Sequence, residues 1–394
     1  MSFKVLHPDI QKFISSNLEQ SIFKLALQKN PFPEVEWSEI INQLACKNKA
    51  KIKLPDYFET ENIIYPSKIS LEQTSSSITA IYKSELVSGE KLIDLSGGFG
   101  IDAYYFSKKV KKVIHCEINQ ELAKIVAHNF DQLKATNIDC FEGDSIDYLK
   151  KNNQKFDWIY IDPSRRNSSK GKVFMLADCL PNVSELQDYY FEFSDNLLIK
   201  TAPILDISAG LAELKNVKKI HIIAINNEVK ELLWEIEKNY VNKIEIKTSN
   251  FSNKKEVFNF ELFQNEQISD FGLPKNYIYE PNAAIMKSGG FDEIGIEFEL
   301  QKLHQNSHLY TSELLKPFPG RVFELENQIE YSKTEMKKNL EHLKANVTVR
   351  NFPETVEEIR KKWKIKDGGN RYCFFTTDKN DNKIVLICKK IKTQ

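Results

Sequence analysis

The sequence lacks the features of several classes of protein. No apolar stretch reaches the roughly 18 residues that a membrane-spanning helix needs, and the first residues lack the apolar block of a secretion signal. The six cysteines are scattered and form no C-x-x-C pair, which argues against a zinc ribbon or an iron–sulfur cluster. His304 and His308 have the spacing of a helical metal-binding pair, but no third ligand accompanies them. We therefore expect a cytoplasmic protein with neither a membrane span nor a metal site.

The chain also lacks net charge, although its charges are unevenly distributed. From Arg321 onward, 17 lysines and arginines stand against 11 aspartates and glutamates. A basic segment of this kind favours contact with a polyanion such as a nucleic acid. The alternative is an ordinary lysine-rich surface exposed to solvent, and charge alone favours the two interpretations equally.

What is present is an alternation of short apolar strands and amphipathic helices. Residues 1–70 have helical spacing of apolar positions, and one helix is expected over 71–86, capped by Ser70. The predicted strands are 91–95, 112–116, 137–141, 157–161, 196–201, 219–225, 243–248 and 256–263, and the helices among them are 120–130, 145–150 and 227–240. This alternation predicts a Rossmann-like α/β fold with a mostly parallel sheet, ending in an antiparallel hairpin.

The same patterns divide the chain into four parts. A helical N-terminal region (1–70) precedes the α/β domain (71–271), and a linker rich in proline, glycine and asparagine opens a small segment (272–322). Residues 323–394 are predicted to form a small α+β domain, with helices at 339–345 and 355–363, a strand at 346–351 and a hairpin of 371–377 with 384–389.

A glycine-rich turn follows the first predicted strand, at residues 94–100 (DLSGGFG). Acidic residues then occur at the ends of the next three strands: Glu117, Asp144 and Asp162. Ligands of open α/β sheets bind at the carboxyl ends of the strands, so all four signals are expected at one edge. Together they predict a nucleotide-type binding site.

The acid in front of the glycines indicates which nucleotide-type ligand binds. Gly98 and Gly100 with a later alanine fit only a loose form of the dinucleotide motif. Asp94 would repel a pyrophosphate but favours a cationic sulfonium and ammonium ligand. The turn resembles the first motif of class I S-adenosylmethionine methyltransferases, acid-x-Gly-x-Gly-x-Gly, with Ser96 in the first glycine position. The resemblance implies that S-adenosylmethionine is the cofactor and that Asp94, Ser96, Gly98 and Gly100 bind it.

The same resemblance gives roles to the later acids. Glu117 would accept hydrogen bonds from both ribose hydroxyls of the cofactor, because a carboxylate takes two O–H donors side by side. Asp144 would accept a hydrogen bond from the adenine amine, although it could instead only cap the helix that follows. Thr74, Ser75 and Ser76 either line the amino-acid end of the cofactor or belong to an ordinary helix surface.

The motif after the fourth strand, residues 162–166 (DPSRR), bears on the chemistry. In class I enzymes that methylate exocyclic amines this position reads Asp/Asn-Pro-Pro-aromatic, where the acid or amide orients the amine and the aromatic ring stacks on the base. The chain keeps Asp162 and Pro163, which we expect beside the cofactor and the methyl acceptor, but it replaces the second proline and the aromatic residue. Arg165 and Arg166 are predicted to hold an anion of the substrate, unless one is ion-paired within the domain.

Neighbouring lysines have predicted roles as well. Lys170 and Lys172 are predicted to add phosphate contacts in a loop that closes over substrate. Lys200, after the fifth strand, is either active or merely exposed.

Four segments together, 94–100, 162–166, 279–284 and 350–353, resemble a bacterial family of class I methyltransferases. Its members carry a ferredoxin-like segment and a C-terminal THUMP-like domain, and the resemblance covers nearly the whole chain. It implies an S-adenosylmethionine-dependent methyltransferase acting on RNA, on a base of tRNA or rRNA. THUMP domains elsewhere bind RNA, so the basic C-terminal domain would grip phosphates with Lys361, Lys362, Lys364, Lys366 and Arg371.

Two alternatives stay open. The first is a small-molecule or protein methyltransferase in which Arg165 and Arg166 hold a carboxylate or phosphate. The second is a non-catalytic RNA-binding protein with a vestigial cofactor fold, against which the intact acids argue. No pattern in the sequence predicts an oligomeric state.

Overall fold

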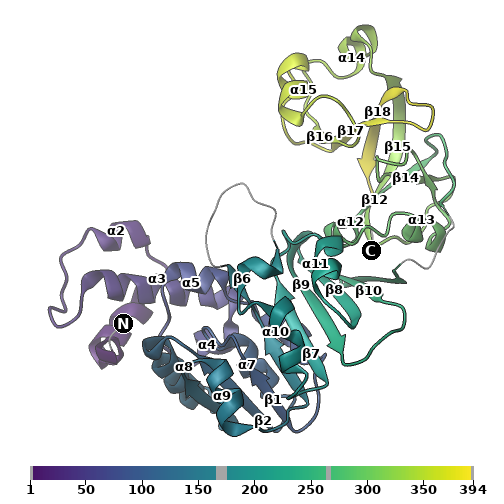
Figure 1. Cartoon of the computed structure of the whole chain (residues 1–394). Helices are drawn as coiled ribbons and strands as arrows, with labels where there is room; N and C mark the ends of the chain where they lie inside the picture. The colour runs from purple at the N-terminus through teal and green to yellow at the C-terminus, as the bar shows by residue number, and fades with distance from the viewer. Residues whose placement is uncertain (1–2, 166–174, 263–267, 392–394) are drawn as a thin grey trace. The chain divides into compact units, whose positions relative to one another are not determined.

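The computed structural model describes residues 3–165, 175–262 and 268–391 (Figure 1). The chain divides into two compact units: residues 1–217 with 234–240, and residues 218–233 with 241–394. Arg166, Lys170 and Lys172 lie outside the described residues. No helix in the described ranges combines the length and apolarity needed to cross a membrane.

The N-terminal region is helical, as expected. Its elements are the 3-10 turn Phe3–Leu6 and the helices α1 (Pro8–Ser16), α2 (Ile22–Ala26), α3 (Trp37–Lys53) and α4 (Pro55–Glu59). Proline occupies the first position of α1 and of α4, where its missing N–H is not needed.

The single helix expected over 71–86 is wrong, because two helices occur there. They are α5 (Lys68–Gln73), capped by Ser67, and α6 (Ser77–Ser84), capped by Ser76. Three consecutive hydroxyl residues break the helix at 74–76, since such side chains offer the backbone alternative partners. The break turns Ser75 into the interior, where it is 7% exposed.

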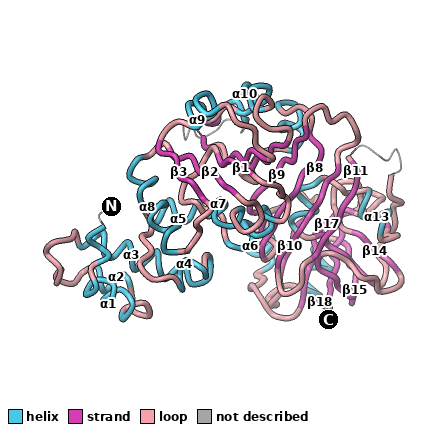
Figure 2. The backbone as a smooth tube through the Cα atoms, turned by 90° about the horizontal axis from the view of Figure 1, so that it is seen from below, coloured by secondary structure: helices cyan, strands magenta, loops and turns pink. Residues whose placement is uncertain are grey.

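Unit 1 contains five parallel strands whose ranges agree with the prediction to within two residues. They are β1 (Lys91–Asp94), β2 (Lys112–Glu117), β3 (Ile138–Glu142), β4 (Trp158–Ile161) and β7 (Asn196–Thr201), in the order β7-β4-β1-β2-β3. The connecting helices are α7 (Ile101–Phe106), α8 (Gln120–Gln132), α9 (Ser145–Asn152), α10 (Val183–Tyr190) and α11 (Ile207–Glu213). Figure 2 shows α9 and α10 on one face of the strands and α7 and α8 on the other. The strand order reverses between β1 and β4, which is where such folds bind ligands.

The helix expected over 227–240 is also wrong. That stretch is strand β9 (Glu228–Glu237), and it follows β8 (Val217–Ile225) through Asn226 and Asn227. Both asparagines have positive φ, 50° and 64°, as a two-residue hairpin turn requires. The Asn226-Asn227 pair is therefore a turn signal in the sequence, and the helical spacing of the apolar residues after it led to the wrong prediction. The full sheet has the order β11-β10-β8-β9-β7-β4-β1-β2-β3, and the antiparallel hairpin of β10 (Glu245–Phe251) and β11 (Glu256–Glu261) is confirmed.

The rest of unit 2 is a seven-stranded sheet of order β13-β14-β12-β15-β18-β17-β16. Its strands are β12 (Tyr277–Pro281), β13 (Gln301–Lys302), β14 (Tyr310–Ser312), β15 (Gly320–Glu330), β16 (Asn346–Val349), β17 (Arg371–Thr377) and β18 (Lys383–Lys390), with the helices α12 (Ala283–Ser288), α13 (Glu293–Glu297), α14 (Lys333–Asn339) and α15 (Val356–Trp363). The linker expected at the start of segment 272–322 is thus partly folded as β12 and α12. The helix expected over 339–345 is misplaced, because α14 ends at Asn339. It begins six residues earlier than predicted, after Ser332, whose side chain caps its N-terminus.

A buried carboxylate explains two of the specific sequence segments in unit 2. Glu280 on β12 is 2% exposed and accepts hydrogen bonds from Arg321 Nε at 2.6 Å and Arg350 Nη2 at 2.8 Å. The segments 279–284 and 350–353 therefore meet in one ion-pair cluster that fastens three parts of this sheet together.

The two histidines singled out in the sequence do not form a metal pair. His304 contacts Asp381 at 3.1 Å, and the ring of His308 stacks on Phe291 at 3.7 Å. Burial lowers the pKa of His308 to about 4, so it is neutral at pH 7. Among the described residues no group of three or more metal-ligating side chains occurs.

Candidate active site

A cavity of about 920 Å³ opens at the carboxyl ends of β1, β2, β4 and β7 in unit 1. All the predicted cofactor-binding residues line it: Asp94, Ser96, Gly98, Gly100, Glu117, Asp144 and Asp162. Asp102 and Glu185 line it as well, and so does Lys200. Carboxylates outnumber cationic side chains among these described residues, so the cavity favours a cationic ligand.

The glycine turn is shaped by close backbone approach. A Cβ on Gly97 would lie 2.4 Å from His115 Cε1 and 2.6 Å from the carbonyl oxygen of Cys116. Gly100 adopts a φ of 77° at the start of α7, where a Cβ would also meet the ring of Phe130. Only glycine fits both positions without displacing neighbours. Gly97 was not singled out in the sequence, although it is the most confined residue of the turn together with Gly100.

Ser96 has a structural reason to replace glycine in the first motif position. Its hydroxyl donates to Asp94 Oδ1 at 3.2 Å and accepts a hydrogen bond from the backbone N–H of Asp162 at 2.6 Å. One side chain thereby joins the ends of β1 and β4. Asp94 itself is 1% exposed and also accepts from the Ser96 N–H at 3.0 Å. This serine fixes the distance between the cofactor turn and the predicted acceptor motif.

Glu117 at the end of β2 is held in a defined orientation. Its two carboxylate oxygens accept hydrogen bonds from the backbone N–H groups of Gly98 at 2.8 Å and Asn119 at 2.7 Å. An ionised carboxylate has about four acceptor positions, so two are taken by the protein. The remaining pair suits a vicinal diol.

Asp144 does cap α9, since Oδ1 accepts from the Ile146 N–H at 2.8 Å. The capping role and the predicted adenine contact are compatible, because one carboxylate oxygen suffices for the cap. Its side chain also borders the cavity.

Lys200 is neither isolated nor simply exposed. Its ammonium forms an ion pair with Asp162 Oδ2, and the two side chains are 13% and 37% exposed. The pair joins the ends of the neighbouring strands β4 and β7. Asp162 therefore faces the cavity with a cationic hydrogen-bond donor beside it, which the sequence motif did not reveal.

A second charged cluster borders the same cavity. Lys83 on α6 is fully buried and lies 3.1 Å from Asp102 Oδ1, while Ser75 and Tyr160 donate to Asp102 Oδ2 at 2.9 and 2.7 Å. Burial by itself would raise the pKa of Asp102, but Lys83, Lys200 and the two hydroxyls outweigh it and lower that pKa. Four elements contribute to this cluster, so no local pattern could have predicted it.

The arginines of the fourth-strand motif are only partly within the described structure. Residues Ser164–Arg165 form the short strand β5, which pairs antiparallel with β6 (Cys179–Leu180), after the 3-10 turn Leu176–Asp178. Ser164 lines the cavity, as does Leu180. The anion-binding roles of Arg165 and Arg166 stay predictions.

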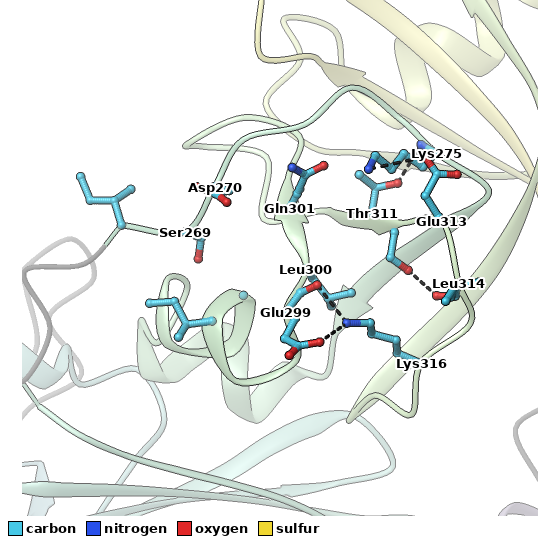
Figure 3. A pocket seen from close by; sticks show the side chains of 14 residues that line it. Ser269, Asp270, Lys275, Glu299, Leu300, Gln301, Thr311, Glu313, Leu314 and Lys316 are labelled. Atoms are coloured by element: carbon cyan, nitrogen blue, oxygen red, sulfur yellow. Dashed lines mark hydrogen bonds and ion pairs between the residues drawn. The ribbon is translucent and has the colours of Figure 1, made fainter.

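A second cavity of about 620 Å³ lies in unit 2 (Figure 3). Its charged side chains largely pair with one another, Lys316 with Glu299 at 2.8 Å and Lys275 with Glu313 at 3.5 Å. It has no glycine turn and no row of strand-end acids among the described residues, so it lacks the features of the first cavity.

The fold and the first cavity define a class I methyltransferase, and the methyl donor of that class is S-adenosylmethionine. Over 98% of its length the chain is similar to 98% of a crystal structure from Porphyromonas gingivalis W83, described as a candidate methyltransferase, with 31% identity and a TM-score of 0.86. The chain belongs to the family of that protein.

Family models match three consecutive parts of the chain. A family described as conserved hypothetical protein 95 matches residues 73–179, a ferredoxin-like domain matches 277–319, and a THUMP-like domain matches 320–390. These matches confirm the expected ferredoxin-like and THUMP-like parts.

Two curated relatives match shorter stretches. An uncharacterized RNA methyltransferase of Mycoplasma mobile is 28% identical over 99 residues, 25% of this chain and 27% of the relative. A protein of Sulfolobus acidocaldarius, provisionally described as a cobalt-precorrin-6B C(15)-methyltransferase (decarboxylating), is 24% identical over 128 residues, 32% of this chain and 62% of the relative. The chain thus spans less than two thirds of either relative.

Proposed function

We propose that this protein transfers the methyl group of S-adenosylmethionine to RNA. The observation that carries the proposal is the acidic cavity at the strand ends, in one chain with a basic THUMP-like domain. The relative from Mycoplasma mobile, described as an RNA methyltransferase, agrees with it.

The residues of the cavity fit the cofactor. Gly97 and Gly100 let the turn pack closely against its own neighbours, where a Cβ would overlap His115 or Phe130, and the buried carboxylate of Asp94 at the cavity suits a nearby positive charge. In this proposal Glu117 holds the ribose hydroxyls with its two remaining acceptor positions, and Asp144 holds the adenine amine. When bound, the cofactor supplies an electrophilic methyl group on a positively charged sulfur.

The protein's own contribution is placement of the acceptor. Ser96 and the β4 backbone hold Asp162 at a fixed distance from the glycine turn. In the proposal Asp162 with Pro163 orients the acceptor for in-line attack, while Arg165 and Arg166 hold a substrate phosphate. Correct alignment of two reactants accounts for much of the rate in such reactions.

The THUMP-like domain, residues 323–394 in this proposal, binds the RNA backbone. Lys362 is paired with Glu354 at 2.9 Å, so it is less suited to phosphate than expected. Exposed side chains remain for that role at Lys361, Lys364 and Lys366.

Cofactor binding is tested first, by thermal shift. Saturating S-adenosylmethionine at about 100 times its dissociation constant should stabilise the fold by about 2.7 kcal/mol. Glu117→Ala should abolish the shift, and Asp188→Ala, an exposed carboxylate outside the cavity, should preserve it. Absence of a shift in the wild-type protein would contradict the proposal.

The acceptor class is tested by transfer of labelled methyl groups to total RNA from a deletion strain. Incorporation into RNA supports the proposal. Incorporation only into a protein or small-molecule fraction refutes it and favours the alternative methyltransferases.

A further inference from the structure

We propose that the methyl acceptor is a ribose 2′-hydroxyl of the RNA rather than an exocyclic amine of a base. The inference rests on the proposed function and specifies the atom that the same site methylates. Two independent features of the cavity carry it: the Lys200–Asp162 pair and the kind of side chains that surround it.

The first feature is a donor and an acceptor in direct contact at the predicted acceptor position. The Lys200 ammonium can only donate hydrogen bonds, and the Asp162 carboxylate can only accept them. A hydroxyl combines both properties on one oxygen atom, so it can donate to Asp162 and accept from Lys200 at once. An exocyclic amine offers N–H donors and no accessible acceptor on the reacting nitrogen, and it would face the ammonium with like polarity.

The second feature is that the described residues lining the cavity include no exposed aromatic ring on which a base could stack. In enzymes that methylate an exocyclic amine, the base leaves the helix and an aromatic ring stacks on it. The aromatic residues among the described lining are Phe99 and Tyr160, which are 4% and 1% exposed. Their rings pack instead against Tyr57 and Phe106. A ribose needs no such platform, because its hydroxyl projects from the backbone that phosphate contacts already position.

The network behind the pair keeps Lys200 in place. Asp102 lies close enough to Lys200 for the lysine to help lower its pKa, and Asp102 is itself held by Lys83, Ser75 and Tyr160. Lys200 is thus attracted from two sides, by Asp162 and by Asp102. A fixed cationic donor of this kind stabilises negative charge as it develops on an oxygen.

The resulting step balances. The hydroxyl oxygen attacks the methyl carbon, an O–C bond forms, and the bond between that carbon and the sulfur breaks with its electron pair left on sulfur. The hydroxyl proton passes to Asp162, which later releases it to water. Lys200 stays protonated and stabilises the partial negative charge on the oxygen.

The test identifies the methylated atom. Total RNA from a deletion strain is labelled by the protein and then hydrolysed in alkali, which cleaves beside every free 2′-hydroxyl and leaves a 2′-O-methylated residue in a dinucleotide. We expect the label in alkali-stable dinucleotides. Label in mononucleotides that carry a methylated base would overturn this inference and leave RNA methylation standing. No transfer to RNA would overturn both.

A variant tests the role of Lys200 separately. Lys200→Met should lower kcat by about 10²- to 10³-fold, the usual loss for one donor to a developing oxyanion, with the KM for S-adenosylmethionine unchanged. Lys200→Arg should recover part of the rate. Lys215→Met, at an exposed lysine of the same unit, is the control and should keep wild-type kcat. A wild-type rate in Lys200→Met, with a normal thermal shift, would refute the role.

Discussion

Lys83→Met offers the sharpest test of how unit 1 is stabilised beside its cavity. Lys83 is 0% exposed, and its nitrogen lies 3.1 Å from Asp102 Oδ1 and 2.8 Å from the Ser75 hydroxyl. Methionine keeps the length of the side chain but removes the charge, which leaves the Asp102 carboxylate buried without its nearest cation. Breaking a buried ion pair from one side costs about 3–5 kcal/mol, whereas losing an exposed pair costs less than about 1 kcal/mol.

Urea unfolding followed by tryptophan fluorescence measures this cost, since Trp37, Trp158 and Trp234 all belong to unit 1. Lys215→Met is the matched control, because the Lys215–Asp188 pair has a similar distance of 3.0 Å but side chains 68% and 74% exposed. We expect the double change Lys83→Met with Asp102→Leu to cost less than Lys83→Met alone, because no uncompensated charge is left. A cost for Lys83→Met no larger than that of the control would refute the reasoning.

The pH dependence has a definite sign. In the wild-type protein the pKa of Asp102 is lowered, so its contribution to stability is present above the unfolded pKa of about 3.9 and is lost as the pH falls through the folded value. In Lys83→Met burial is no longer opposed by the nearest cation, so the pKa of Asp102 should rise. The deficit of the variant should therefore be largest at neutral pH and shrink at acidic pH, where Asp102 takes up a proton. A deficit that grows on acidification would contradict this account.

Three further results are expected. Gly97→Ala should abolish the thermal shift with S-adenosylmethionine, because its Cβ would overlap His115 and the carbonyl oxygen of Cys116. A wild-type shift would refute the steric argument. Glu280→Gln should destabilise unit 2 by about 3–5 kcal/mol, because it removes the buried carboxylate that pairs with Arg321 and Arg350. Urea unfolding followed by Trp363 fluorescence measures this cost, and an unchanged midpoint would contradict it. Three exposed lysines, Lys361, Lys364 and Lys366, are replaced together by glutamine, and tRNA binding is measured by fluorescence anisotropy at several salt concentrations. The slope of log K against log[salt] should become about 2 to 3 units less negative, because three phosphate contacts are lost. An unchanged slope would exclude these lysines from phosphate contact.

The errors of the sequence prediction share a physical cause. The stretch 227–240 has apolar residues at spacings that suit a helix, but Asn226 and Asn227 form a tight turn at its start, and its apolar side chains then pack within the sheet. Similarly, Thr74 to Ser76 interrupt an amphipathic pattern that otherwise suits one helix. In both cases a short polar segment with specific backbone geometry outweighed the periodicity of longer flanking stretches.

The sequence alone determined the parallel strands of unit 1, the glycine turn at 94–100 and the acids that follow each strand, because these are local patterns repeated along the chain. Parallel strands bring their carboxyl ends to one edge, so the cofactor-type cavity followed from those patterns. Only the tertiary structure decided which charges meet. Asp162 and Lys200 are 38 positions apart in the sequence, and Asp102 forms an ion pair with Lys83 on another helix. Such pairings depend on how the elements pack and not on any spacing in the sequence. The site's donor beside Asp162 was therefore visible only once the chain was folded.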